Sequence, residues 1–291
     1  MLSAKEIKQR IKSISSIKQI TRAMEMVAAS RLKKVEARVL ASRTYAEKMQ
    51  QVLSHLCSYG SSEKAHPLLT ERAHEVPVIK IILITADKGL CGAYNNNIIQ
   101  KVVKFAKEHT NKAIRLVHVG KKGYLYFSKR DYSIEKYFPE NVEKFEYAQV
   151  QTLASQLING YEAGEFGQLY LFYTKFHTVM QSFPSHIQLL PIEKSIFESK
   201  EKTSVEYIFE PSADQILDHL FPRYIETQLY QCIHESLTSE YAARRVAMIA
   251  ATENAGEMID ELTRSYNKAR QEIITKELLE VVSGAEALIK G

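Results

Sequence analysis

The chain has 291 residues, of which 45% are hydrophobic and 25% charged. This length gives room for about two domains of ordinary size, and the composition is typical of a folded globular protein rather than a disordered one. No stretch approaches the ~18 apolar residues of a membrane-spanning helix. The most apolar run, Val78 to Ala86, is interrupted by Lys80, so we expect no direct insertion into a membrane. The basic N-terminus lacks the apolar core of a secretory signal, and we expect no leader peptide.

The cysteines indicate neither a disulfide framework nor a metal site. Cys57, Cys91 and Cys232 are far apart and odd in number, and no CxxC pair occurs. The nine histidines fall in no HExxH or similar ligand spacing. We therefore predict a reducing compartment, no bound metal and no cofactor.

Positive charge is concentrated at the N-terminal end. Residues 1–57 contain twelve Lys or Arg and four Glu, a net charge of +8, whereas the rest of the chain carries 27 Lys or Arg and 30 Asp or Glu, a net charge of −3. A basic segment of this kind can face nucleic acid, an anionic membrane surface or an acidic protein, or can simply be a solvated face. Charge alone leaves these alternatives open.

The segment from Met1 to Tyr59 contains neither Gly nor Pro and is predicted to form one long helix. Its apolar residues recur every three or four positions, and we expect this narrow stripe to be the seam of a coiled coil. The stripe consists of Ile7, Ile11, Ile14, Ile17, Ile20, Met24 and Val27. The helix is expected to end at the breaker cluster that starts at Gly60.

A second long helix is predicted after Pro222, the last proline of the chain. Ile225, Leu229, Ile233 and Leu237 repeat every four residues there. At a rise of about 1.5 Å per residue, the two helices would be on the order of 80 and 100 Å long, too long for either to be buried by a small domain. We expect them to bury each other as an antiparallel coiled coil.

The middle of the chain changes period and predicts an α/β fold. Strands are expected at Val78–Thr85, Ile114–Gly120 and Gln168–Phe176, because these runs are short and rich in β-branched or aromatic residues. Helical patterns lie between them, at Asn97–His109 and Phe145–Tyr161. This alternation predicts a small, mostly parallel, Rossmann-like sheet. The predicted domains are residues 1–59 for the first coiled-coil helix, 70–210 for the α/β head and 212–291 for the second coiled-coil helix.

The segment TADKGLCGAYN, Thr85 to Asn95, is a glycine-containing loop between a strand and a helix, where phosphates often bind. It lacks both GxGxxG and GxxxxGK[ST]. Asp87, Lys88 and Cys91 could form a nucleophile with charged neighbours, but no His lies nearby in the sequence to act as a base. We favour a turn or a contact with another subunit and predict no catalytic residue.

Six segments spread over nearly the whole chain carry a family resemblance. They are AKEIKQRI, ITRAMEMVAASR, DKGLCGAYN, RYIETQLYQ, ARRVAMIAATENA and YNKARQEIITKELLEVVSGA. Together they resemble the gamma subunits of rotary (F-type) ATP synthases. The resemblance implies a left-handed coil of the terminal helices inside a hexamer of alternating alpha and beta subunits. It also implies that the α/β head lies on the membrane c-ring beside the epsilon subunit.

The resemblance assigns contact residues to this chain. Arg22, Met24 and Arg31 would lie near acidic lever loops of the beta subunits. Arg270, Gln271 and Thr275 would hydrogen-bond the catch loops. Tyr207 and Glu210 would belong to the foot that meets the ring and epsilon, and Asp87 and Lys88 would make subunit contacts. Phe209 stands where some relatives have Tyr, so a hydroxyl contact is not expected at that position.

The resemblance further implies a non-catalytic subunit. Beta subunits would make or hydrolyse ATP, and this chain would be the central rotor shaft that couples them to a proton- or sodium-translocating ring. Its place would be peripheral, on the cytoplasmic face of the bacterial inner membrane. The residues leave two alternatives: a basic coiled-coil protein that binds nucleic acid, opposed by the lack of a recognised nucleic-acid module, and an α/β enzyme that uses the 85–95 loop. We expect no nucleic-acid partner.

Overall fold

The computed structural model of the chain describes residues 3–59, 66–72, 76–139, 142–193 and 213–289. Backbone contacts divide the chain into two compact units. The larger, Ala29–Arg244, is called here the head unit; the smaller, Met1–Ala28 with Arg245–Gly291, is called the tail unit. Two long helices, α1 (Ala4–Tyr59) and α5 (Ala213–Ile289), each contribute residues to both units.

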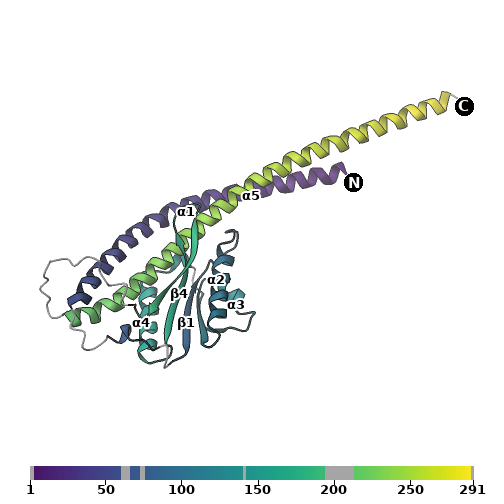
Figure 1. The fold of residues 1–291 in the computed structure, drawn as a ribbon. Coiled ribbons are helices and arrows are strands. Elements are labelled where there is room, and N and C mark those ends of the chain that lie inside the picture. The colour runs from purple at the N-terminus through teal and green to yellow at the C-terminus, as the bar shows by residue number, and fades with distance from the viewer. Residues whose placement is uncertain (1–2, 60–65, 73–75, 140–141, 194–212, 290–291) are drawn as a thin grey trace. The chain divides into compact units, whose positions relative to one another are not determined.

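A five-stranded sheet forms the centre of the head unit (Figure 1). Its strands are β1 (Val78–Ile84), β2 (Ala113–Val119), β3 (Ser133–Phe138), β4 (Gln168–Phe176) and β5 (Ser182–Leu190). They lie in the order β3-β2-β1-β4-β5. The pairs β1–β2, β1–β4 and β2–β3 are parallel, and β4–β5 is antiparallel. The predicted mostly parallel α/β sheet is therefore confirmed.

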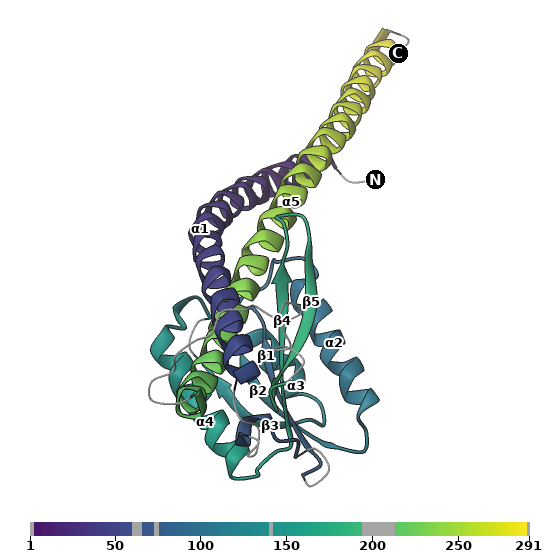
Figure 2. The same cartoon turned by 60° about the vertical axis from the view of Figure 1, so that its left-hand side comes forward.

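Helices cover both faces of this sheet (Figure 2). Alternate residues of β1 point to opposite faces, so Ile81 packs in a cluster with α2 (Tyr94–Glu108) and α3 (Lys121–Phe127), whereas Ile82 packs with α4 (Tyr147–Glu162) and α5. Because helices cover both faces, β1 needs apolar side chains on both, and this is why VIKIILI reads as a nearly continuous hydrophobic run. Short 3₁₀ turns, η1 (Pro67–Leu69) and η2 (Val142–Lys144), complete the described elements of the head unit.

The sequence predicts the central strands of the sheet but neither its two edge strands nor the short helix α3. The three predicted strands and two predicted helices lie within a few residues of β1, β2, β4, α2 and α4. Strands β3 and β5 were not predicted; they are the two edges of the sheet. β3 carries Glu135 and Lys136, and β5 contains Pro184. Charges and proline are tolerated on edge strands but weaken the strand pattern in a sequence.

The two long helices run antiparallel within each unit. In the head unit, Arg31 and Arg43 of α1 bond Tyr241 and Glu235 of α5. In the tail unit, the Thr252 hydroxyl donates to the Thr21 hydroxyl at 2.8 Å, and Gly256 lies beside Lys18. Rising residue numbers on α1 meet falling numbers on α5 in both units, so the antiparallel prediction is confirmed.

The predicted seam of α1 is correct at its start and wrong further along. Ile7 is buried, but Ile17, Ile20 and Val27 are more than half exposed. At about 100° per residue, the steps of the predicted stripe drift by roughly 160° around the helix between Ile7 and Val27. The buried positions follow a heptad spacing instead. They are Thr21, Ala28, Leu32, Val35, Val39, Ala46 and Leu53.

Helix α5 contains the last proline of the chain. It starts at Ala213, so Pro222 lies inside it rather than before it. Proline removes one helical hydrogen bond, but Phe221 and Ile225 on either side are fully buried in the core of the head unit, and this burial offsets the loss. In the part of the chain that the structure describes, no helix is long and apolar enough to cross a bilayer.

Candidate functional site

The loop after β1 is held in one conformation by its neighbours. Thr85 donates its backbone N–H to Val119, and its hydroxyl accepts from Gly123 N at 2.9 Å. Gly120 has φ of 107°, and a Cβ there would collide with the Thr85 carbonyl, so glycine is required. Leu90 also has a positive φ, 63°, yet its side chain is exposed. The loop is therefore rigid at its base and presents Leu90 at its tip.

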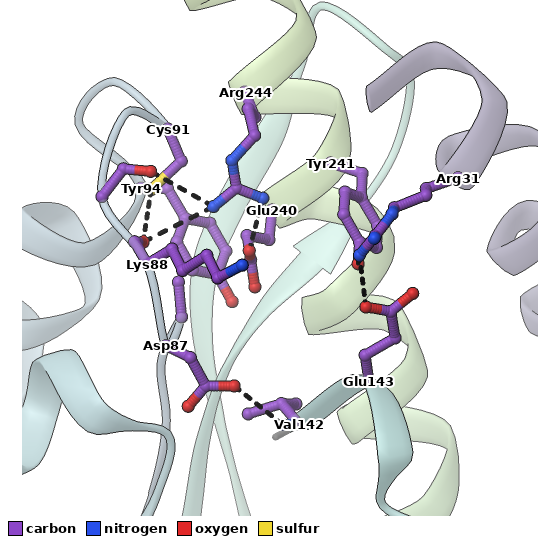
Figure 3. A network of polar contacts seen from close by, with 12 residues as sticks. Arg31, Asp87, Lys88, Cys91, Tyr94, Val142, Glu143, Glu240, Tyr241 and Arg244 are labelled. Carbon is purple, nitrogen blue, oxygen red and sulfur yellow. Dashed lines mark hydrogen bonds and ion pairs between the residues drawn. The ribbon is translucent and has the colours of Figure 1, made fainter. Parts of the chain in front are cut away.

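Asp87 fastens the loop to two other segments. One carboxylate oxygen accepts from Lys121 N at 3.1 Å, and the other accepts from Val142 N at 2.9 Å (Figure 3). A carboxylate that accepts two backbone N–H groups is strongly held. Asp87 thus joins β1, the start of α3 and the turn η2, whereas Lys88 beside it is exposed.

Cys91 is unsuited to nucleophilic chemistry. The thiol is buried, and burial raises its pKa, so the reactive thiolate is disfavoured. Asn95 Nδ2 donates to its sulfur at 3.2 Å, while Asn95 Oδ1 accepts from Ala86 N at 2.9 Å. Cys91 and Asn95 therefore close the loop onto the first turn of α2.

Helix α5 fills the place where ligands bind in many sheets of this type. That place lies beyond the carboxyl ends of the strands, where the strand order reverses, here between β1 and β4. Ser236 Oγ lies 2.7 Å from the Tyr94 hydroxyl and accepts from Thr174 N at 3.3 Å. Ser239 Oγ donates to the Thr174 carbonyl at 3.1 Å. Arg244 completes the filling by donating to the carbonyls of Lys88 and Gly89 at 3.5 and 3.3 Å.

The Arg244 guanidinium is balanced by a buried acid one turn earlier. Arg244 Nη1 donates to Glu240 Oε1 at 2.6 Å, and both side chains are about nine-tenths buried (Figure 3). Burial raises the pKa of the Glu240 carboxyl, and Arg244 opposes that rise. Burial therefore favours the neutral Glu240 acid at this place, whereas the Arg244 guanidinium favours the charged carboxylate.

A second, more exposed ion pair links α1 to the turn η2. Arg31 Nη1 donates to Glu143 Oε2 and to the Tyr241 hydroxyl on α5, and both ion-pair side chains are nearly half exposed. Burial raises the pKa of Tyr241 to about 12, so its hydroxyl stays protonated at neutral pH. Asp87 of the β1 loop accepts from Val142 of η2, and Arg31 of α1 donates to Glu143 of η2, so the β1 loop and α1 are both attached to this turn.

Comparison with known proteins identifies the family. A family model described as ATP synthase matches residues 3–288. The chain is 42% identical over 288 residues to the ATP synthase gamma chain of Desulforamulus reducens, covering 99% of this chain and 100% of that relative. Identity and coverage are the same for the gamma chain of Desulfitobacterium hafniense. The chain belongs to the ATP synthase gamma family.

Solved structures agree with the gamma-family fold. A chain of the Tetrahymena thermophila mitochondrial ATP synthase, in its central stalk and c-ring, is 27% identical, with a TM-score of 0.56 over 80% of this chain and 99% of that one. A chain of the Euglena gracilis mitochondrial ATP synthase has 17% identity and a TM-score of 0.69, covering 98% of this chain and 94% of that one. A gamma chain is a non-catalytic subunit of its complex. No group of residues suited to hold a metal ion occurs in the described part of this gamma-family chain.

The contact residues predicted for this gamma-family chain lie in several places. Arg31, Asp87 and Lys88 belong to the network just described (Figure 3). The exposed Arg22 pairs with the mostly buried Glu25 one turn along α1, and Met24 is half-buried beside them. On α5, three exposed residues follow one another within two turns, and the Thr275 hydroxyl donates to the Gln271 carbonyl. These three are Arg270, Gln271 and Thr275. Tyr207 and Glu210 lie outside the described residues.

Sequence reasoning did not single out the gamma-family residues that connect the loop to the helices. They are Glu143, Glu240, Tyr241 and Arg244. A signal was present for Arg244, because it is the second residue of the ARRVAMIAATENA segment that carried part of the resemblance. Glu143 gave none, since its partner Arg31 is 112 residues away and pairing over that distance depends on the sheet between them.

Proposed function

We propose that this chain is the central rotor shaft of a proton- or sodium-translocating ATP synthase. It couples rotation of a membrane c-ring to ATP synthesis or hydrolysis in surrounding alpha and beta subunits. Family membership supports the assignment. The observation that carries it in the structure is the unpaired end of α5.

Within the tail unit, the last part of α5 extends past the first described residues of α1 (Figure 1). Antiparallel pairing through Thr21 and Thr252 places Ala4, the first residue of α1, opposite about Ala269. Beyond that level α5 continues to Ile289, and its apolar side chains are 43% to 71% exposed. They are Ile273, Ile274, Leu278, Leu279, Val281 and Val282. Exposed apolar surface of this extent favours a protein partner that surrounds the helix.

The mechanism requires a stiff rod. An asymmetric shaft that presses on one beta subunit after another stabilises the open or closed state of each through different contacts. The absence of Gly and Pro from residues 1–59 favours an unbroken helix. The basic charge of the same segment fits acidic loops on the partner, because opposite charges set register and encounter rate.

The partner contacts are proposed residue by residue. Arg22, Met24 and Arg31 face acidic loops of beta. Arg31 can exchange its present partner Glu143 for an acidic residue of beta, because both side chains of the pair are nearly half exposed. Asp87 shapes the β1 loop, and Lys88 presents its charge beside the exposed Leu90. The remaining proposed contacts are those of Arg270, Gln271 and Thr275 with alpha and beta and of Tyr207 and Glu210 with epsilon and the ring. In the predicted division, residues 1–59 and 212–291 are the shaft helices. Residues 70–210 are the α/β domain that carries the proposed ring contacts.

The shaft is proposed to be a peripheral protein on the cytoplasmic face of a bacterial membrane, attached through the ring. The finding that no described helix can cross a bilayer is compatible with this place. The alternative of a basic nucleic-acid-binding coiled coil receives no support from relatives that are ATP synthase gamma chains.

Co-purification tests the proposal. The tagged chain is co-expressed with the alpha and beta subunits of its own organism and purified. We expect all three subunits in one complex with ATPase activity, and no activity from the isolated chain. Recovery of the tagged chain alone, or ATP turnover by it above a contaminant control, contradicts the proposal.

A further inference from the structure

We propose that Arg43 is a positioning residue that locks α1, α5 and the sheet together so that they turn as one body. The three groups that meet, Arg43, Glu235 and the Phe176 carbonyl, are called the Arg43 clamp. The inference rests on the proposed rotor function, because a shaft needs its head and helices to rotate without slipping.

One guanidinium joins three elements of the head unit. Arg43 lies on α1, and its Nε donates to Glu235 Oε1 on α5 at 2.9 Å. Its Nη2 donates to the carbonyl of Phe176, the last residue of β4, at 2.6 Å. A planar guanidinium holds several donors in a fixed fork, so both partners are constrained at once. A movement of α1 along α5 or along β4 would break one of the two bonds.

The partner acid depends on this contact. The Glu235 side chain is 2% exposed, and Gln231 Nε2 gives it a second bond at 3.2 Å. Its other oxygen, Oε2, is buried with no hydrogen-bond partner in the described part of the chain. A buried carboxylate with few donors has a strong preference for the one position in which its cation reaches it. The Arg31–Glu143 pair, also made by α1, is nearly half exposed and lacks this constraint.

Helix α5 also forms hydrogen bonds with β4 close to Phe176. Ser236 and Ser239 bond the backbone N–H and carbonyl of Thr174, two residues before Phe176. The apolar contacts of α1 in this region, through Leu32 and Val35, are non-directional and resist sliding weakly. Arg43 therefore joins α1 to the hydrogen-bonded layer that α5 and β4 form.

Substitutions can distinguish the positioning role of Arg43 from its contribution to the stability of the fold. Arg43→Met should destabilise the chain, because it leaves Glu235 buried without its cation. In Arg43→Met/Glu235→Leu an apolar pair replaces the ion pair, and such replacements often restore stability. They do not restore a directional bond. Stability should therefore recover in the double variant while the register of α1 against β4 stays loose.

The experiment measures that register in the full chain. Spin labels are placed through Lys48→Cys on α1 and Lys175→Cys on β4, both exposed, in a Cys57→Ser background. The width of the distance distribution is measured beside thermal unfolding. We expect Arg43→Met and the double variant to widen the distribution about two-fold, with the melting temperature recovered only in the double variant. The matched control Lys34→Met, an exposed cation on the same helix, should change neither.

The same variants are then assembled with alpha and beta subunits and a c-ring. Ion pumping per ATP hydrolysed should fall in the double variant and remain as in wild type for Lys34→Met. A double variant with the wild-type distance distribution overturns the clamp whatever the assembly does. A wild-type chain that fails to assemble overturns the proposed rotor function instead, and the distance measurement on the isolated chain still decides the clamp.

Discussion

At the scale of single residues, Arg244 has the largest set of consequences for the candidate site. Its guanidinium neutralises the buried Glu240 carboxylate and supplies donors to two carbonyls of the β1 loop. Arg244→Met should reduce the free energy of unfolding by about 3 to 5 kcal/mol at neutral pH, the usual effect of leaving a buried charge unpaired. Urea unfolding of the purified chain measures this loss.

The pH dependence of this variant gives its internal control. Burial raises the pKa of Glu240 even beside Arg244. Without Arg244 the folded state holds the proton more tightly than the unfolded chain, so stability should fall as pH rises from the ordinary carboxyl pKa through the raised one. Arg244→Met/Glu240→Gln should recover stability at neutral pH and lose this slope. A single variant as stable as wild type would show that the pair is not needed.

Two buried histidines predict loss of stability in acid. Burial lowers the pKa of His118 and of His234 to about 4, and neither ring nitrogen of either residue has a partner in the described part of the chain. The unfolded chain takes up these protons near pH 6.5, whereas the folded chain does so only near pH 4. Stability should therefore be intact above pH 6.5 and decline by up to about 3 kcal/mol per histidine as pH falls to 4.

Substitution separates the two contributions. His118→Leu should flatten the acid side of the profile of unfolding free energy against pH. His177→Gln, at the exposed turn between β4 and β5, is the matched control and should leave the profile as in wild type. An unchanged profile in His118→Leu would contradict the assignment of the acid loss to His118.

Met24 offers a residue-scale test of coupling. Met24→Lys would place a cation beside the Arg22–Glu25 pair, facing the acidic loop proposed for beta. A new charge-assisted contact of about 1 to 3 kcal/mol would stabilise one rotary state and raise the barrier to leaving it. The assembled variant should hydrolyse ATP but pump fewer ions per ATP. Pumping equal to wild type would count against the proposed contact.

At the scale of elements, the seam of α1 can be tested with two residues of one type. Leu32 is buried in the seam, whereas Leu40, about two turns later, is 59% exposed. Leu32→Ala should reduce the unfolding free energy of the purified chain by about 2 to 5 kcal/mol, and Leu40→Ala by less than about 0.5 kcal/mol. Equal losses would mean that the heptad seam is misplaced.

Helix α1 also shows which structural features the sequence predicts and which it does not. Helix length, the α/β centre and antiparallel pairing follow from breakers and from periodicity, which are local properties. The face of α1 that pairs with α5 could not be read from Ile17, Ile20 and Val27, because its buried positions include small or polar residues such as Ala28 and Thr21 beside large apolar ones. The links Asp87–Val142 and Arg31–Glu143 join residues far apart in the chain. Such links depend on strand order, which periodicity does not give.

At the scale of the whole molecule, the exposed end of α5 predicts a division of roles. Val281 and Val282 are exposed, and apolar contacts with a surrounding sleeve would be non-directional. Deleting about ten C-terminal residues should therefore weaken assembly more than it reduces torque, because the deletion removes burial but leaves Met24, Arg270 and Gln271. Yield of the complex and single-molecule torque measure the two effects. A truncated chain that assembles normally yet produces no torque would refute the proposal that the exposed end of α5 serves assembly rather than torque.

The crevice filled by α5 has a consequence for nucleotide binding. For a nucleotide to bind there, Ser236, Ser239 and Arg244 would first have to leave their bonds to β4 and the β1 loop. Nucleotide binding in this crevice is therefore opposed by the contacts that fill it. A shaft with an open crevice there would change shape with the ATP concentration of the cell. With the crevice filled, this part of the head unit would keep one shape at high and low ATP concentration.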